Sequence, residues 1–149
     1  MNKKTHLAIG LAIGLYFVRF ATYKLSFIPI VLFSSLLPDI DSTSSSLGER
    51  RIFRPIQLFF KHRGPLHSFT VAVLISLIFL FFYPIIALPF FLGYSFHLFA
   101  DSFTPRGIRP FWPLKTISSG VAKSGGVFDK GLFIIFIVLD IILLISFLN

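Results

Sequence analysis

The side chains best able to do chemistry in this chain are its four histidines and six acidic residues. His62 and His67 flank a Gly-Pro turn in the stretch KHRGPLHS (61–68), and farther along His97 precedes Asp101 by four residues. On a helix, an imidazole and a carboxylate at this spacing share one face, one turn apart, and can bind one cation. A packed histidine near a helix-terminal aspartate has the same spacing, so the spacing alone leaves both interpretations open.

Three further residues extend this chemistry: His6 near the start of the chain, and Asp39 and Asp41 directly after an apolar run that ends at Pro38. Neutral imidazoles and carboxylates favour zinc, with manganese or iron as alternatives. These side chains together exceed what one tetrahedral ion uses, so they allow either one ion with supporting residues or two ions. Because the chain has no cysteine, thiolate ligands and a cysteine nucleophile are excluded.

The composition is that of a membrane protein: 55% of the residues are hydrophobic, 13% are charged and 21 are phenylalanine. A soluble domain has about a quarter of its residues charged. The net charge of +8 would suggest nucleic-acid binding in a soluble protein, but in a membrane protein it marks loops that face an anionic leaflet. We therefore expect contacts with membrane lipids and no direct binding of nucleic acid.

Polar or Gly- and Pro-rich segments divide the chain into five apolar runs, at residues 5–20, 25–37, 66–82, 85–100 and 131–148. Crossing a bilayer takes about 20 helical residues. Residues 1–149 are thus predicted to form one domain, an all-α polytopic membrane bundle of about four or five transmembrane helices. The short second run could instead pair with the first as a re-entrant hairpin. Residues 52–60 have apolar side chains at helical spacing, which fits an amphipathic helix on the membrane or an ordinary surface helix.

The positions of the basic residues predict the topology. With the N-terminus in the cytoplasm, every basic residue except Arg19 and Lys24 lies on a cytoplasmic segment, which is a strong positive-inside bias. The same arrangement puts all four histidines, together with Asp39, Asp41 and Asp101, at the cytoplasmic ends of the apolar runs. We therefore expect a polar metal site at the cytoplasmic face of the bundle.

Several short motifs occur in a fixed order along the chain: His6, LLPDID (36–41), HRGPLHS (62–68), His97-x3-Asp101 followed by SFTPRG (102–107), and Trp112-Pro113. This order resembles the YdjM-like family over roughly residues 3–115. The family is described as LexA-binding, membrane-bound metal-dependent hydrolases of the prokaryotic inner membrane. Leu66 departs from the pattern, because threonine is expected there. More distantly, His-x3-Asp is similar to the element found in zinc phospholipase C and P1 nuclease.

The leading hypothesis is a metal-dependent hydrolase that acts on an ester or phosphoester at the bilayer, with a lipid as one substrate class. A bound divalent ion polarises an ester or phosphoryl oxygen and acidifies water. The expected metal ligands are His6, Asp39, His67, His97 and Asp101. Asp41 and His62 are weaker candidates, either as ligands or as the general base, while Arg63 and Thr104 are candidates for holding the substrate.

Two hypotheses from other classes stay open. In the first, the metal site is structural and the basic loops dock a cytoplasmic regulator protein. In the second, the protein transports metal ions, but carriers place polar ligands near mid-membrane. Only Asp140 is expected at that depth, in the middle of the last apolar run and facing the bundle interior.

Overall fold

The computed structural model describes residues 1–41, Arg54 and residues 64–148. His62, Arg63 and all of the predicted amphipathic segment 52–60 except Arg54 lie outside the described residues. The main helices are α1 (Lys3–Phe17), α2 (Lys24–Ser34), α4 (Phe69–Phe82), α5 (Pro84–Ser102) and α6 (Val127–Leu148). Short 3-10 turns add η1 (Val18–Phe20), η2 (Leu37–Asp41) and η4 (Pro65–His67). Over the described ranges the sole β pairing is an isolated bridge between Ile108 and Ser118, so the predicted all-α class is confirmed.

Helix α5 is the centre of the bundle, because it packs against α1, α2 and α4. Its contact with α2 is closest at Gly93, where an added Cβ would lie 2.2 Å from both Ser34 Oγ and the backbone oxygen of Val31. The Ser34 hydroxyl donates to backbone carbonyls of its own helix and lies 3.3 Å from the carbonyl oxygen of Pro89 on α5. The absence of a side chain at Gly93 therefore lets the two backbones approach.

The start of α4 differs from the helix predicted over 66–82. The Ser68 hydroxyl accepts a hydrogen bond from the backbone N–H of Val71, which is the usual role of an N-cap serine. Pro65 begins the separate turn η4, so α4 itself begins at Phe69. His67 consequently lies in a short turn before the helix, where its direction is set independently of the helical repeat.

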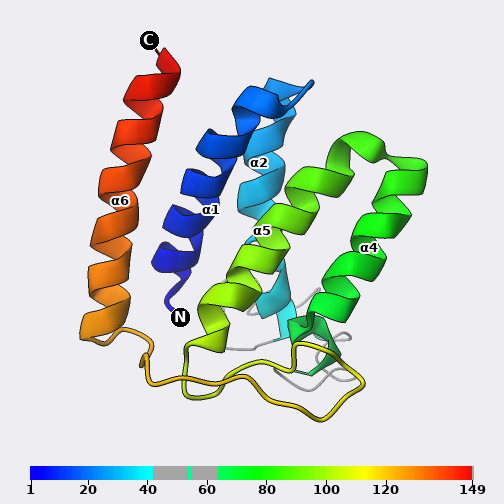
Figure 1. The fold of residues 1–149 in the computed structure, drawn as a ribbon, viewed down its shortest axis with the longest axis vertical. Coiled ribbons are helices and arrows are strands. Elements are labelled where there is room, and N and C mark those ends of the chain that lie inside the picture. The colour runs from blue at the N-terminus through cyan, green and yellow to red at the C-terminus, as the bar shows by residue number, and fades with distance from the viewer. Residues whose placement is uncertain (42–53, 55–63, 149) are drawn as a thin grey trace.

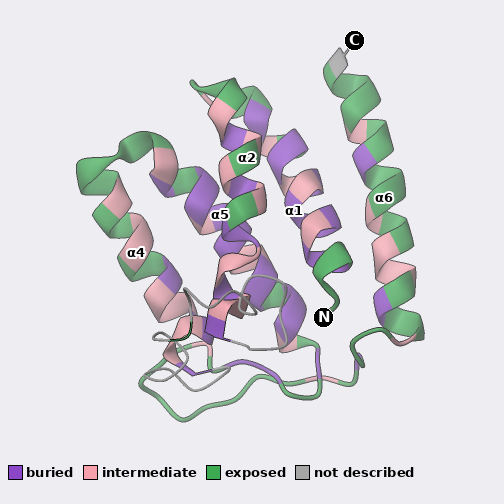
Figure 2. Ribbon diagram, turned by 180° about the vertical axis from the view of Figure 1, so that it is seen from behind, coloured by how far each residue is buried: buried purple, intermediate pink, exposed green. Residues whose placement is uncertain are grey.

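Two of the described helices are long and apolar enough to cross a membrane, at Pro84–Ser102 and Val127–Phe147. They have different surroundings, because 56% of the first span is buried inside the protein and only 6% of the second. Figure 2 shows the contrast between the buried α5 and the exposed α6. Two carboxylates of α6 are buried nonetheless, Asp129 in its first turn and Asp140 in mid-helix. The exposed fraction of Asp140 is 5%, as expected for a mid-helix carboxylate that faces the bundle interior.

The helices bring several chain segments to one end of the molecule. The starts of α1, α4 and α6 and the ends of α2 and α5 lie at this end, and the C-terminus lies at the other (Figure 1). Asp129 joins α6 to α1 there, since its carboxylate accepts a hydrogen bond from the Thr5 hydroxyl at 2.7 Å and from the backbone N–H of Asn2 at 3.0 Å. The described polar residues of the predicted site belong to segments at this end.

Replacement of Gly93 by alanine is expected to destabilise the bundle, because the new Cβ would overlap the α2 backbone. Overpacking of this kind costs roughly 1–3 kcal/mol. Circular dichroism of the detergent-solubilised protein should therefore show a lower thermal midpoint. Gly131→Ala is the matched control, because a Cβ there meets nothing within 4 Å. An unchanged midpoint for Gly93→Ala would contradict the close α2–α5 packing.

Candidate metal centre

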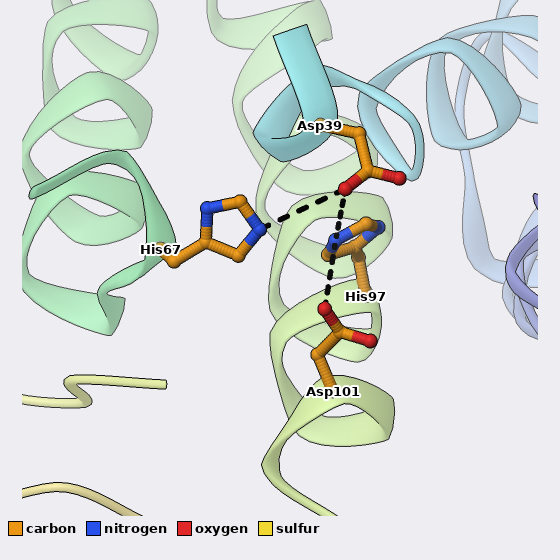
Figure 3. A group of neighbouring side chains, drawn as sticks. All are labelled: Asp39, His67, His97 and Asp101. Carbon is orange, nitrogen blue, oxygen red and sulfur yellow. Dashed lines mark ion pairs between the residues drawn. The ribbon is translucent and has the colours of Figure 1, made fainter. Parts of the chain in front are cut away.

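Four acidic and imidazole side chains from three separate segments meet at the end of α5. Asp39 comes from η2, His67 from η4, and His97 and Asp101 from α5 (Figure 3). One ligand atom from each lies within 4.8 Å of the others. The Oδ1 atom of Asp39 is 3.8 Å from Nε2 of both His67 and His97, and His97 Nε2 is 4.0 Å from Asp101 Oδ2. Residues far apart in the sequence thus converge on one point.

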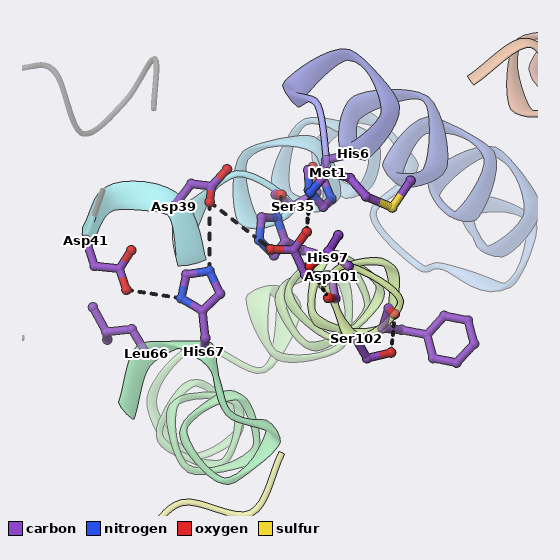
Figure 4. Close-up of polar contacts among 12 residues, drawn as sticks. Met1, His6, Ser35, Asp39, Asp41, Leu66, His67, His97, Asp101 and Ser102 are labelled. Carbon is purple, nitrogen blue, oxygen red and sulfur yellow. Dashed lines mark hydrogen bonds and ion pairs between the residues drawn. The ribbon is translucent and has the colours of Figure 1, made fainter. Parts of the chain in front are cut away.

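A second carboxylate orients His67. Its Nδ1 atom is 3.1 Å from Asp41 Oδ2, and both side chains are buried (Figure 4). An ionised carboxylate can only accept, so Nδ1 carries the proton and donates it to Asp41. This hydrogen bond leaves Nε2 directed at Asp39. A histidine held through one nitrogen by a carboxylate, with the other directed at a cation position, is the usual arrangement of a metal-binding imidazole.

A backbone carbonyl orients His97 in the same way. Its Nδ1 atom donates to the carbonyl oxygen of Ser35, just past the end of α2, at 2.7 Å. Its Nε2 atom is buried and has no hydrogen-bond partner among the residues that the structure describes. Because a buried polar atom without a partner is costly, this lone pair is available for an ion.

His6 completes the cluster from α1. Its ring stacks on that of His97, with the ring centroids 3.9 Å apart and the planes inclined by 16°. Its Nε2 atom is 3.3 Å from Asp101 Oδ1, and the backbone nitrogen of Met1 contacts the same oxygen. The exposed fraction of His6 is 1%, and neither ring nitrogen finds a hydrogen-bond partner in the described part of the chain. His6 is therefore a third imidazole within reach of an ion bound beside Asp101.

The charges of the cluster act strongly on two of its titratable groups. Burial raises the pKa of Asp39, but contacts with the His67 side chain and with the charges of His97 and His6 outweigh it and bring the pKa to about 2. Burial lowers the pKa of His67, but the carboxylates of Asp39 and Asp41 outweigh it and raise the pKa to about 9. Without a metal ion, His67 therefore carries the positive charge that balances these carboxylates at neutral pH.

The donor set fits a divalent first-row metal ion. Two carboxylates and two or three imidazoles are ligands that zinc, manganese and iron accept. With bonds of about 2 Å, neighbouring ligand atoms stand roughly 3–3.5 Å apart. The three separations given above, 3.8–4.0 Å, are wider than this, and all the ligand atoms of the group lie within 4.8 Å of one another, so a bound ion would draw the side chains closer together. Asp39, His67, His97 and Asp101 would hold the ion, with His6 as a further ligand.

The five metal ligands predicted from the sequence thus lie together in space, whereas Asp41 and Thr104 have other contacts. Asp41 contacts Nδ1 of His67, whereas Asp39 contacts Nε2, so Asp41 does not face the common point (Figure 4). Thr104 is buried, and its hydroxyl donates to the backbone carbonyl of Asp101 at 2.7 Å. His62 and Arg63 lie outside the part of the chain that the structure describes.

Sequence reasoning missed two groups that position the histidines. The carbonyl of Ser35 is a backbone atom, so no side-chain pattern could indicate it. Tyr94 lies on α5 three residues before His97, and its hydroxyl donates to the carbonyl of Leu66 at 2.5 Å. That bond holds η4, and with it His67, against α5. The sequence could have indicated this contact, because the Tyr94 hydroxyl lies on the helix face that also carries His97 and Asp101.

The fold and the site define an all-helical membrane protein with a buried His/Asp cluster at one end of its bundle. The YdjM inner membrane protein family matches residues 1–147, and the chain belongs to this family. The family resemblance and the inner-membrane location predicted from the sequence are therefore confirmed. The side of the membrane on which the N-terminus lies stays a prediction.

Two curated relatives are similar to part of the chain, both called inner membrane protein YdjM. One is from Escherichia coli (strain K12) and the other from Shigella flexneri, and each is 39% identical over 97 residues. The matched region covers 59% of this chain and 50% of each relative, so the chain spans about half the length of the curated relatives it matches. No solved structure matches the chain significantly.

Metal affinity is expected to rise with pH. The pKa of His67 lies near 9 in the metal-free protein, so an ion bound at neutral pH displaces one proton from this ring, whereas Asp39 with a pKa near 2 has none to lose. Each displaced proton makes the apparent affinity about tenfold stronger per pH unit. Calorimetric zinc titrations between pH 6.5 and 8.5 measure this slope. An affinity independent of pH would contradict the protonated, metal-facing His67.

Proposed function

We propose that the chain is a metal-dependent hydrolase of the inner membrane that cleaves an ester or phosphoester at the cytoplasmic face. The observation that supports this function best is the orientation of the buried histidines. His67 and His97 are each held through Nδ1 by a separate acceptor, and each directs Nε2 at Asp39. Polar atoms held in place in advance of binding are typical of metal sites used for catalysis.

The proposed ligands of the ion are His6, Asp39, His67, His97 and Asp101. Zinc is the first choice, with manganese or iron as alternatives, and either one or two ions. When bound, a divalent ion supplies positive charge that acidifies water and stabilises charge on an ester or phosphoryl oxygen. Asp39 has the most exposed side chain of the four clustered residues, at 23%, so we infer that substrate approaches from its side.

The remaining residues have proposed roles around this centre. Asp41 keeps His67 oriented, because it accepts the Nδ1 hydrogen. His62 is proposed as the general base that removes a proton from water, and Arg63 as a group that binds an anionic part of the substrate. Thr104 supports the end of α5 by bonding the Asp101 carbonyl. Substrate could be a membrane lipid, since the site lies at the end of a candidate span.

The proposed membrane topology has four or five crossings with the N-terminus in the cytoplasm. Among the helices that the structure describes, α5 and α6 have the length and apolarity for a full span. In this proposal the shorter α1, α2 and α4 cross the membrane beside them, or α1 and α2 form a re-entrant hairpin. The charge bias of the connecting segments supports this orientation, because only Arg19 and Lys24 fall on the opposite side.

A second candidate function is a structural metal site in a membrane binding protein. The near-complete burial of His67, His97 and Asp101 favours it, because structural sites are closed to solvent. In that case the basic loops would dock a cytoplasmic regulator, and the family resemblance suggests LexA. Metal transport is less favoured, since the donor cluster lies at one end of the bundle rather than near its middle.

A hydrolysis assay tests the leading proposal. The zinc-loaded protein in detergent is offered a p-nitrophenyl phosphate diester and a fluorescent phospholipid, beside Asp101→Asn and Asp140→Asn. We expect Asp101→Asn to lose at least about 100-fold in rate. Asp140→Asn makes the same chemical change outside the cluster and should retain activity.

The alternatives predict other results. If the site is structural, no substrate is cleaved even with metal bound, and chelation lowers the thermal midpoint of the protein. Full activity in Asp101→Asn, with its fold confirmed by circular dichroism, would contradict the proposed metal centre.

A further inference from the structure

A second site with polar residues follows the helix that carries His97 and Asp101. A cavity of about 330 Å³ lies just past the end of α5, lined by Thr104, Pro105, Arg106, Lys123 and Ser124. Its volume lies within the range of small-molecule sites in proteins. Two cations and two hydroxyl-bearing residues border it, and none of its lining residues among those that the structure describes is acidic. We propose that this cavity binds the phosphate group of an anionic ligand.

Backbone hydrogen bonds fix the walls of the cavity. The carbonyl of Thr104 accepts from the N–H groups of Gly107, at 2.9 Å, and Gly120, at 3.1 Å. The carbonyl of Phe103 accepts from the N–H of Ala122 at 2.9 Å. Segments that lie nearly twenty residues apart in the chain are thus tied side by side. Arg106 and Lys123 are carried to the same cavity by this framework rather than by chance contacts of flexible side chains.

Gly107 is required for this loop geometry. Its φ of +62° is a conformation that residues with side chains rarely adopt, and an added Cβ would lie 2.2 Å from the carbonyl oxygen of Ser118. Next to it, Ile108 and Ser118 exchange two backbone hydrogen bonds, at 2.9 and 3.0 Å. The loop of residues 103–126, drawn mainly in yellow below the bundle in Figure 1, is therefore held in a defined conformation by backbone hydrogen bonds.

The charges at the cavity favour an anion. Residues 103–126 contain four basic residues and no acidic one. Within the described ranges, no ion pair is found for Arg106 or for Lys123. An arginine guanidinium binds phosphate through two parallel hydrogen bonds, and lysine adds a point charge.

Within the described residues, the negative groups at the end of α5 are already hydrogen-bonded or buried. The last carbonyls of α5 point this way, but that of Ala100 accepts from the Phe103 N–H, and that of Asp101 accepts from Thr104. The Asp101 carboxylate itself is buried among His6 and His97. Among the described residues, the charged side chains that border the cavity are thus those of Arg106 and Lys123.

The position of the cavity suggests what the phosphate belongs to. Thr104 lines the cavity, and its hydroxyl bonds to the backbone of Asp101, a proposed metal ligand. A ligand phosphate held here would lie at the same end of α5 as the proposed metal ligands, so we infer that the substrate of the proposed hydrolase is a phosphate-bearing molecule. This last step rests on the proposed function, whereas phosphate binding by Arg106 and Lys123 does not. The phosphate could come from a lipid headgroup or from a water-soluble phosphoester.

Calorimetry with matched charge variants tests the inference. Inorganic phosphate and short-chain phosphatidic acid are titrated separately into the detergent-solubilised full chain. The test variant is Arg106→Gln with Lys123→Gln, and the control is Arg109→Gln with Lys115→Gln, which removes the same charge from the same loop outside the cavity. We expect the test pair to weaken binding at least tenfold and the control pair to change it less than about twofold.

The two titrations separate the sources, because a lipid site binds phosphatidic acid more tightly than inorganic phosphate, and a soluble-ligand site binds the two alike. No binding of either probe to the parent, or equal weakening by both double variants, would overturn the inference. Zinc content and hydrolysis are measured on the same samples. Phosphate binding without hydrolysis rejects the proposed function and keeps the pocket. Hydrolysis unaffected by Arg106→Gln with Lys123→Gln rejects the pocket as the place where the substrate phosphate binds and keeps the proposed function.

Discussion

The structure depends on the burial of several imidazoles and carboxylates at a single point. Burying such groups is costly unless each finds a partner. Here the partners come from several segments, because Asp39 lies between His67 and His97, and Asp101 lies beside His6. The Nδ1 atoms of His67 and His97 donate to Asp41 and to the Ser35 carbonyl. The cluster therefore links α1, η2, η4 and α5. Within the described residues His97 Nε2 has no hydrogen-bond partner, and a divalent ion would provide one.

The helices serve this arrangement through close backbone contacts at one end. α5 supplies two residues of the cluster from one helical face and is buried between three other helices, which gives those residues a fixed position. Gly93 allows α2 to approach α5, so that Ser35, one residue past the end of α2, reaches His97. The same end carries the loop that follows α5, where Arg106 and Lys123 meet at a second polar cavity. The proposed cation site and the proposed anion site thus share the short stretch from Asp101 to Arg106.

Much of this could be predicted from the sequence, because apolar runs and polar breaks determine where membrane helices begin and end. The helical class follows from that pattern, as does the end of the bundle at which His6, His67 and His97 lie. The i, i+4 spacing placed His97 and Asp101 on one face, as found. The details of η4 could not be predicted, because Gly64-Pro65 and the Ser68 cap compete for the start of α4 and only tertiary contacts decide. The role of the Ser35 carbonyl and the loop contacts of Thr104 are backbone interactions between distant segments, which residue types do not encode.

The most direct test of the account is elemental analysis of the detergent-purified protein after loading with zinc or manganese and removal of excess ion. The parent and the Asp140→Asn variant are expected to retain one or two equivalents of metal, and His97→Ala and Asp101→Asn to lose it while keeping their helical content. A parent that retains no metal, or variants that retain as much as the parent, would contradict a metal centre built from Asp39, His67, His97 and Asp101.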